Sequence, residues 1–150
     1  MVRGGSIDPW SSEQSTDYDR MIEQFGLTPI DLGSIPNPGM LHRRGIVFAH
    51  RDMDVITDSI TKGDPFGVLT GLMPSGRMHL GHSMVIEQVR WFQEQGADVT
   101  VAVADLEALA TRGTPLSKGR ETALREYVLN YAALGLDADK TRVYFQSSRP

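Results

Sequence analysis

Two histidines, His79 and His82, stand three residues apart directly after a turn that is rich in glycine and proline. The turn begins at Gly71 and follows a short apolar run at 66–70. A strand, such a turn and a helix in succession form an anion site, because the free N–H groups and the positive end of the helix attract phosphate. Residues three apart on a helix share one face, so both imidazoles are placed to donate to one phosphate group. The pattern predicts a site where a nucleotide triphosphate is held and attacked.

Gly81 lies between the two histidines and leaves the helix surface without a side chain, so that a base or ribose can lie against the backbone. The turn lacks the Gly-Lys-Ser/Thr of a P-loop and the G-x-G-x-x-G of a dinucleotide site. One alternative is a helix start with two solvated histidines. A metal site is a second alternative, although the sequence offers no third ligand at a suitable spacing nearby.

The elements that hold this site are predicted from apolar runs and helix breakers. Three nearly uncharged runs predict strands buried on both faces, as in a parallel sheet covered by helices. These strands lie at 67–70, 98–104 and 141–146. Helices are predicted between them at 77–95, at 105–112 and from a cap at Ser117 to about 134. This order implies right-handed crossovers and an α/β fold, the first half of a Rossmann-like parallel sheet nucleotide-binding domain.

Residues 1–65 are predicted to form a helical amino-terminal extension, and 66–150 the nucleotide-binding half-domain. Periodic apolar residues and breakers indicate helices at 17–26, 40–45 and 50–61, with a loop at 27–39. The tail at 1–16 either docks through Trp10 or is flexible with one incidental aromatic residue.

Composition narrows the class of protein. The formal net charge of −4 argues against a basic nucleic-acid coat, although a local basic patch is compatible with it. The chain has no cysteine, which excludes disulfides and thiolate metal sites and fits a reducing cytosol. No apolar run is long enough to span a bilayer, and the first residues lack the apolar core of a signal peptide. We therefore expect a cytoplasmic protein with no membrane partner.

Residues 74–82, Pro-Ser-Gly-Arg-Met-His-Leu-Gly-His, resemble the HIGH signature of class I aminoacyl-tRNA synthetases, in the form used by the tyrosyl and tryptophanyl enzymes. Residues 101–108 are similar to the next segment of both. Upstream segments resemble the amino-terminal extension of archaeal and eukaryotic tryptophanyl-tRNA synthetases, and tyrosyl enzymes have nothing comparable there. These segments lie at 8–10, 17–19, 25–26 and 43–53. The resemblance runs from Asp8 to Pro150 and makes 66–150 the first half of the catalytic domain.

The resemblance implies a two-step reaction. The carboxylate of tryptophan attacks the α-phosphate of ATP, bound with Mg²⁺, and gives tryptophanyl-adenylate and pyrophosphate. The aminoacyl group then passes to the 3′ adenosine of tRNA(Trp). Since the carboxylate is already a nucleophile, the protein mainly supplies position and charge stabilisation. Members of the family are usually homodimers, so the implied partners are tryptophan, ATP, tRNA(Trp) and a second copy.

The resemblance also implies site residues, with His79 and His82 as the catalytic pair. The implied ATP-binding residues are Gly71, Pro74, Ser75, Gly76, His79, Gly81 and His82. The implied amino-acid pocket comprises Leu69, Thr70, Gly71, Ala102 and Glu107. Glu107 is the candidate partner of the ammonium or the indole nitrogen; as an alternative, it stabilises a helix dipole. Eukaryotic members carry tyrosine and glutamine where Leu69 and Ala102 lie, so indole recognition is expected to differ.

Two further sets of polar residues have alternative interpretations. The dense basic cluster, which the family would place near the ATP site or the tRNA acceptor end, comprises Arg43, Arg44, His50 and Arg51. Helical spacing predicts that Arg44 and Arg51 share a face; the alternative is a solvated face paired with nearby aspartates. Asp105 follows the second strand and is predicted to cap the next helix, with a site residue as the alternative.

The second phosphate-binding signature of the class, the KMSKS loop, has no counterpart in the sequence. We therefore expect a fragment of a catalytic domain, whose complete enzyme needs residues beyond 150, and no useful rate of adenylate formation from these 150 residues alone. The alternatives are a tyrosyl-tRNA synthetase and a non-catalytic nucleotide- or tRNA-binding module derived from a synthetase. An open sheet edge after the third strand adds a risk of association.

Overall fold

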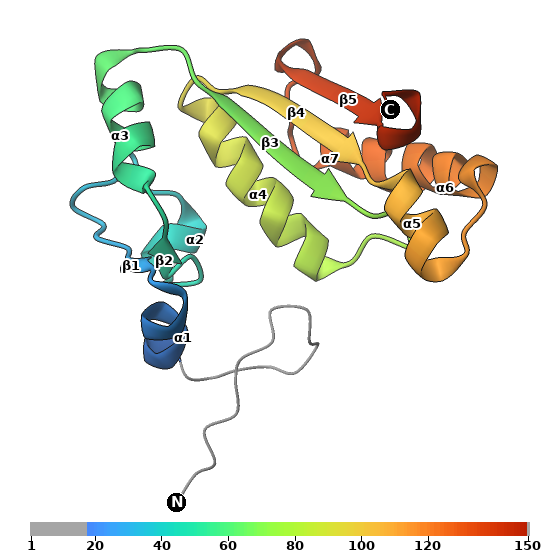
Figure 1. Ribbon diagram of the computed structural model, residues 1–150. Helices are drawn as coiled ribbons and strands as arrows, with labels where there is room; N and C mark the ends of the chain where they lie inside the picture. The colour runs from blue at the N-terminus through green and yellow to red at the C-terminus, as the bar shows by residue number, and fades with distance from the viewer. Residues whose placement is uncertain (1–17, 150) are drawn as a thin grey trace, which may run out of the picture. The chain divides into compact units, whose positions relative to one another are not determined.

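The computed structural model describes residues 18–149, and the chain divides into two compact units, residues 1–54 and 55–150 (Figure 1). The predictions for the tail, including docking through Trp10, lie outside the described residues. Within the described residues, no helix is both long and apolar enough to cross a bilayer.

The first unit is built from short elements. They are α1 (Tyr18–Phe25), β1 (Thr28–Pro29), α2 (Met40–Arg43), β2 (Ala49–His50) and the start of α3 (Met53–Lys62). β1 and β2 pair antiparallel within the segments predicted as a loop and as a helix start. The helix predicted from His50 begins three residues later because His50 pairs in β2, and its Nδ1 accepts the Met53 N–H at 3.1 Å.

The prediction that Arg44 and Arg51 share a helix face is wrong. Arg44 ends α2, whereas Arg51 lies in a bend between β2 and α3. The Arg51 guanidinium donates to the backbone oxygen of Phe25 at 2.6 Å. The basic residues therefore belong to separate elements, because the pairing of β1 with β2 interrupts the helical spacing on which the prediction depended.

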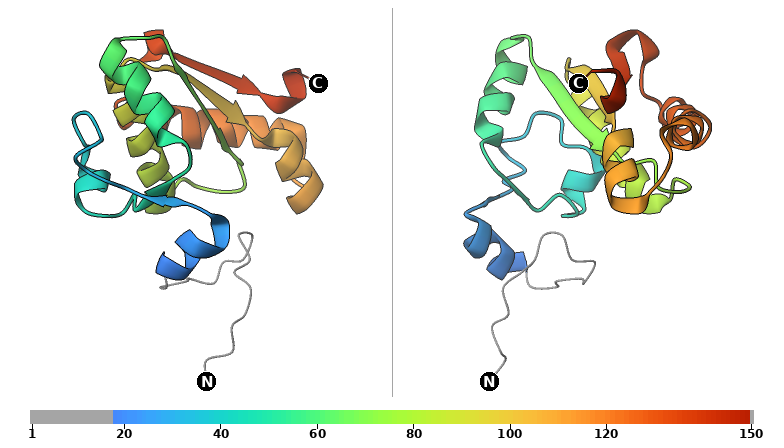
Figure 2. Two further views of the ribbon diagram at one scale, coloured as in Figure 1. Left: turned by 60° about the vertical axis from the view of Figure 1, so that its left-hand side comes forward. Right: turned by 45° about the vertical axis from the view of Figure 1, so that its right-hand side comes forward.

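The second unit contains a three-stranded parallel sheet in the order β3–β4–β5. Its strands are β3 (Gly67–Leu72), β4 (Asp98–Val103) and β5 (Thr141–Phe145). Helix α4 (Leu80–Glu94) connects β3 to β4, and α5 (Asp105–Arg112) begins the helical connection to β5 (Figures 1 and 2). The predicted α/β order of strands and helices is confirmed.

The helical connection continues differently from the prediction. Ser117 is not a cap: α6 (Leu116–Thr122) begins directly after Pro115, whose fixed φ and missing N–H suit a helix start. The single helix expected to about 134 consists of α6, a π-helix η1 (Ala123–Val128) and α7 (Leu129–Ala133). Gly135, with φ of 90°, follows its end. The 3₁₀ turns η2 (Ala138–Lys140) and η3 (Gln146–Ser148) flank β5.

The two faces of the sheet differ. One face packs on α4 and on the η1–α7 helix through a single cluster, formed by Leu72, Ile86, Val89, Val99, Val101, Tyr127, Tyr131 and Leu136. The other face is open along β3, where Leu69 is 71% exposed. The prediction of strands buried on both faces therefore fails for β3 and β5 and fits only the central strand β4, where Asp98 and Thr100 are the exceptions.

Candidate active site

The turn between β3 and α4 is short and anchored at both ends. The Ala104 N–H donates to the backbone oxygen of Leu72 at 3.1 Å, which ties the end of β3 to the end of β4. The Ser75 N–H donates to the Met73 carbonyl at 2.8 Å. Pro74 is buried in the turn, so it contributes packing, whereas the next residue, Ser75, is exposed. Helix α4 starts at Leu80, three residues later than predicted, because the turn extends to His79.

His79 and His82 cap the start of α4 reciprocally. Nδ1 of His79 accepts the Gly81 N–H at 3.2 Å, and the His79 N–H donates to Nδ1 of His82 at 3.2 Å. The two ring centroids are 4.0 Å apart. Because Nδ1 accepts in both rings, each neutral imidazole carries its proton on Nε2. The cap thus leaves two Nε2–H donors at the positive end of a helix.

Burial lowers the pKa of His82, and the neighbouring His79 lowers it further. His82 is therefore a neutral donor at pH 7. Its ring edge also meets the ring of Tyr127, with 5.6 Å between centroids and 81° between planes. This contact adds a second constraint on the orientation of the His82 ring.

The missing side chains of Gly81 and Gly76 have different structural consequences. A Cβ on Gly81 would lie 3.1 Å from Cε1 of His79, so the absent side chain makes room for that ring. The sequence assigned this space to a base or ribose, whereas in the structure the His79 ring lies against it. A Cβ on Gly76 would meet nothing within 4 Å. Gly76 is exposed, and the space above it is open to a ligand.

The residues predicted for the amino-acid pocket do not all lie together. Strand register places Leu69 beside Thr100 and Gly71 beside Ala102, on the open face of the sheet. Thr70 alternates with them, so its side chain lies on the opposite, helix-covered face. The Thr70 side chain therefore does not share the face that carries Leu69 and Gly71. Glu107 is an exposed residue in the first turn of α5.

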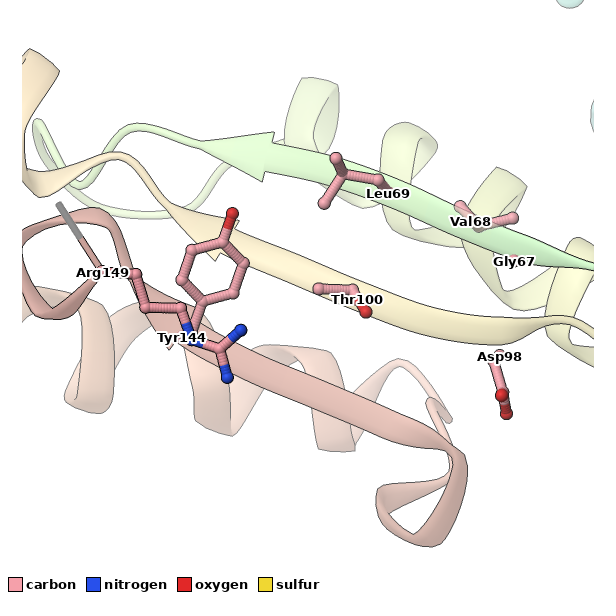
Figure 3. A pocket seen from close by; sticks show the side chains of 7 residues that line it. All are labelled: Gly67, Val68, Leu69, Asp98, Thr100, Tyr144 and Arg149. Carbon is pink, nitrogen blue, oxygen red and sulfur yellow. The ribbon is translucent and has the colours of Figure 1, made fainter.

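The open face carries a hollow of about 450 Å³ (Figure 3). It is lined by Gly67, Val68, Leu69, Asp98, Thr100, Tyr144 and Arg149. The Arg149 guanidinium lies 5.2 Å from the centroid of the Tyr144 ring. Sequence reasoning missed Thr100, Tyr144 and Arg149. Strand alternation was the available signal for Thr100, which lies two residues before Ala102; Tyr144 needed the register of β5.

Asp105 is not the N-cap of α5, which is Ala104. It is 1% exposed and accepts hydrogen bonds from the Ser147 N–H at 3.0 Å and from the Ser147 hydroxyl. Arg120 Nε lies 3.8 Å from its carboxylate. Burial disfavours its charge, but the hydrogen bonds from Ser147 and from nearby backbone N–H groups outweigh it and lower the pKa of Asp105. This carboxylate ties the end of β5 to α5 and α6.

The family model described as tRNA synthetases class I (W and Y) matches residues 61–150. The chain belongs to the class I tRNA synthetases. It is 46% identical over 143 residues to the tryptophan–tRNA ligase of Methanosarcina acetivorans. This match covers 94% of this chain and 32% of that relative. Among the residues described in this synthetase, no three His, Asp or Glu side chains are placed to hold a metal ion.

Solved synthetase structures resemble the chain closely. The tryptophanyl-tRNA synthetase of Aeropyrum pernix K1 matches with a TM-score of 0.83 and 41% identity, over 96% of this chain and 41% of that one. The Encephalitozoon cuniculi enzyme, bound to tryptophan, matches with a TM-score of 0.79 and 27% identity, over 89% and 42%. The resemblance to tryptophanyl-tRNA synthetases and the Rossmann-like fold are thereby confirmed. The chain spans about a third to two fifths of the length of these three proteins.

Proposed function

We propose that this chain is the first ATP-binding part of a synthetase that activates tryptophan with MgATP and transfers it to tRNA(Trp). The observation that carries the proposal is the reciprocal histidine cap, which leaves two Nε2–H donors side by side at the start of α4. The names of the relatives supply the amino acid. In this proposal, residues 1–65 are an extension of the catalytic domain, 66–150 are its first half, and the complete cytoplasmic enzyme is a homodimer.

The chemistry requires stabilised charge more than a base. As the tryptophan carboxylate attacks the α-phosphate, negative charge grows on the phosphate oxygens that leave with pyrophosphate. His79 and His82 donate Nε2–H to these oxygens, aided by the helix start. A neutral His82 can serve this purpose, because its Nδ1 accepts the His79 N–H and its proton therefore stays on Nε2. The open space over Gly76 lets the phosphates approach the turn.

The amino acid is proposed to lie on the open face of the sheet near its carboxyl end. Leu69, Gly71 and Ala102 share that face, and the missing side chain of Gly71 leaves room beside Ala102. Glu107 is the proposed partner of the ammonium or the indole nitrogen. Thr70 contributes through its backbone alone, because its side chain lies on the other face.

The test uses the complete open reading frame that contains these residues, in an ATP–pyrophosphate exchange assay with tryptophan and with tyrosine. Tryptophan-dependent exchange is expected, and His82→Ala should lower it by roughly two orders of magnitude or more through loss of a transition-state contact. Preferential exchange with tyrosine would assign the chain to a tyrosyl enzyme. Absence of exchange with either would favour a non-catalytic binding module. The 150-residue chain alone is expected to show no useful exchange.

A further inference from the structure

A buried tyrosine supports the turn from the side of the helices. Tyr127 belongs to η1 and is 1% exposed. Its hydroxyl donates to the Met73 carbonyl at 3.2 Å. Burial raises the pKa of Tyr127, while hydrogen bonds from the backbone of Gly76 and Ser75 oppose that rise. The hydroxyl thus ties η1 to the turn through the Met73 carbonyl.

The ring of Tyr127 contacts the candidate catalytic histidine as well. Its centroid lies 5.6 Å from that of His82, with the rings nearly perpendicular. Because Nδ1 of His82 is already occupied by the His79 N–H, the tyrosine ring supplies a second constraint on the imidazole plane. The direction of Nε2–H then depends on both contacts.

The element that delivers Tyr127 is unusual. A π-helix is rare in proteins, occurs mostly as a single widened turn, and is found frequently at functional sites. Here it interrupts an otherwise continuous helix between α6 and α7, and both Ala123 and Tyr127 are buried from it. A rare backbone feature therefore places this side chain under the turn.

The same helix offers a matched comparison. Tyr131 lies one turn further on, is 3% exposed, and its ring centroid is 6.5 Å from that of Tyr127. Its hydroxyl is buried and has no hydrogen-bond partner among the described residues. The two tyrosines have similar burial and belong to the same core cluster, but only the hydroxyl of Tyr127 reaches the turn.

We infer that Tyr127 is a positioning residue for the activation reaction: its hydroxyl holds the turn at the Met73 carbonyl, and its ring orients His82. This inference rests on the proposed function, because that turn and His82 are assigned to the phosphates of ATP. It acts through them and does not itself touch the substrate.

The experiment compares Tyr127→Phe with Tyr131→Phe in the full-length protein, by ATP–pyrophosphate exchange. Each variant keeps its ring and loses only the hydroxyl. Tyr127→Phe should lower kcat/KM for ATP roughly tenfold, the size expected when one hydrogen bond that holds the turn is lost, while KM for tryptophan changes less than about twofold. Tyr131→Phe should leave both constants at the wild-type values.

Two results would refute the inference about Tyr127, and both differ from the result that would refute the proposed function. If the wild type exchanges with tryptophan but Tyr127→Phe behaves like Tyr131→Phe, Tyr127 does not position the site. Equal loss toward ATP and tryptophan would mean a general structural effect. Wild-type protein without exchange would instead defeat the proposed function.

A second measurement keeps the test valid if Tyr127→Phe folds poorly. The Tyr127 hydroxyl is buried and donates to the Met73 carbonyl at 3.2 Å, so its hydrogen should exchange slowly with solvent in the wild type. Free exchange of this hydroxyl hydrogen in the folded wild-type protein would show that the contact is absent and refute the inference without any variant.

Discussion

His79 has two functions that one substitution separates. Its Nδ1 accepts the Gly81 N–H at 3.2 Å and so caps α4, while its Nε2–H is assigned to phosphate. Asparagine at this position places an acceptor oxygen where Nδ1 lies and is one of the best N-cap residues. It has no atom at the position of Nε2. His79→Asn should therefore keep the cap and remove the phosphate contact.

The expected magnitudes differ enough to be measured independently. The cap contributes about 1 kcal/mol, and at 3.2 Å its hydrogen bond is at the long end of the normal range. His79→Asn should change the free energy of unfolding by less than about 0.5 kcal/mol, whereas His79→Ala should lose roughly the full cap. Loss of one donor to developing charge lowers turnover by roughly 10²–10³, or about 2.7–4 kcal/mol.

The assays are urea unfolding and tryptophan-dependent ATP–pyrophosphate exchange on the full-length protein, with wild type, His79→Asn and His79→Ala side by side. The expected pattern is equal loss of exchange in both variants and loss of stability in the alanine variant alone. Exchange close to the wild-type rate in His79→Asn would refute the assignment of Nε2–H to phosphate. Destabilisation of His79→Asn to the level of His79→Ala would refute the cap.

Three further predictions concern stability, each measured by the urea midpoint. Burial lowers the pKa of His42 and of His82, and neighbours of like charge lower it further, so the folded state favours the neutral rings. The stability that these neutral rings contribute is complete above about pH 6.5 and should decline as pH falls below that value; a flat stability profile from pH 7.5 to 5 would contradict this prediction. Gln93 is buried and bonds Thr141 at 2.9 Å, so Gln93→Leu should cost about 2–3 kcal/mol, and a loss under 0.5 kcal/mol would show that these bonds contribute little. Asp105→Ala, which leaves the Ser147 N–H and hydroxyl without their acceptor and removes the ion pair with Arg120, should cost about 3 kcal/mol; a neutral result would mean that the carboxylate adds nothing net.

Local sequence signals predicted the sheet well, because strands and breakers are encoded over short stretches. The largely apolar runs predicted β4 and β5 to within one residue, and Gly113 marked the end of α5 at Arg112. The turn with His79 and His82 was recognisable from its residues alone. The sequence does not reveal which face of β3 is covered, because the covering elements lie far away in the chain. Leu69 was therefore expected to be buried.

The errors share a physical cause in long-range contacts. Asp105 resembles a cap locally, but its partner Ser147 lies 42 residues away. Thr70 was grouped with Leu69 by proximity in sequence, although strand alternation separates their side chains. The π turn had no detectable signal, since helical composition is the same on both sides of it. Tyr127 was therefore indistinguishable from any core aromatic residue.

The number of residues in the helix from Leu116 to Ala133 is constrained, because Gly119 and Tyr127 must both lie toward the turn between β3 and α4. A Cβ on Gly119 would lie 3.8 Å from the ring of Pro74, so α6 already lies against the turn. Tyr127, eight positions later, would point about 80° away from Gly119 in a regular α-helix. The wider π turn advances the chain by a smaller angle per residue and brings both onto one side. Without one residue of 123–126, this tyrosine would lie seven positions after Gly119, only about 20° from it in a regular α-helix, so the π turn accommodates one extra residue while keeping Tyr127 toward the site. Variation in this segment is therefore limited by residue count as well as by residue type.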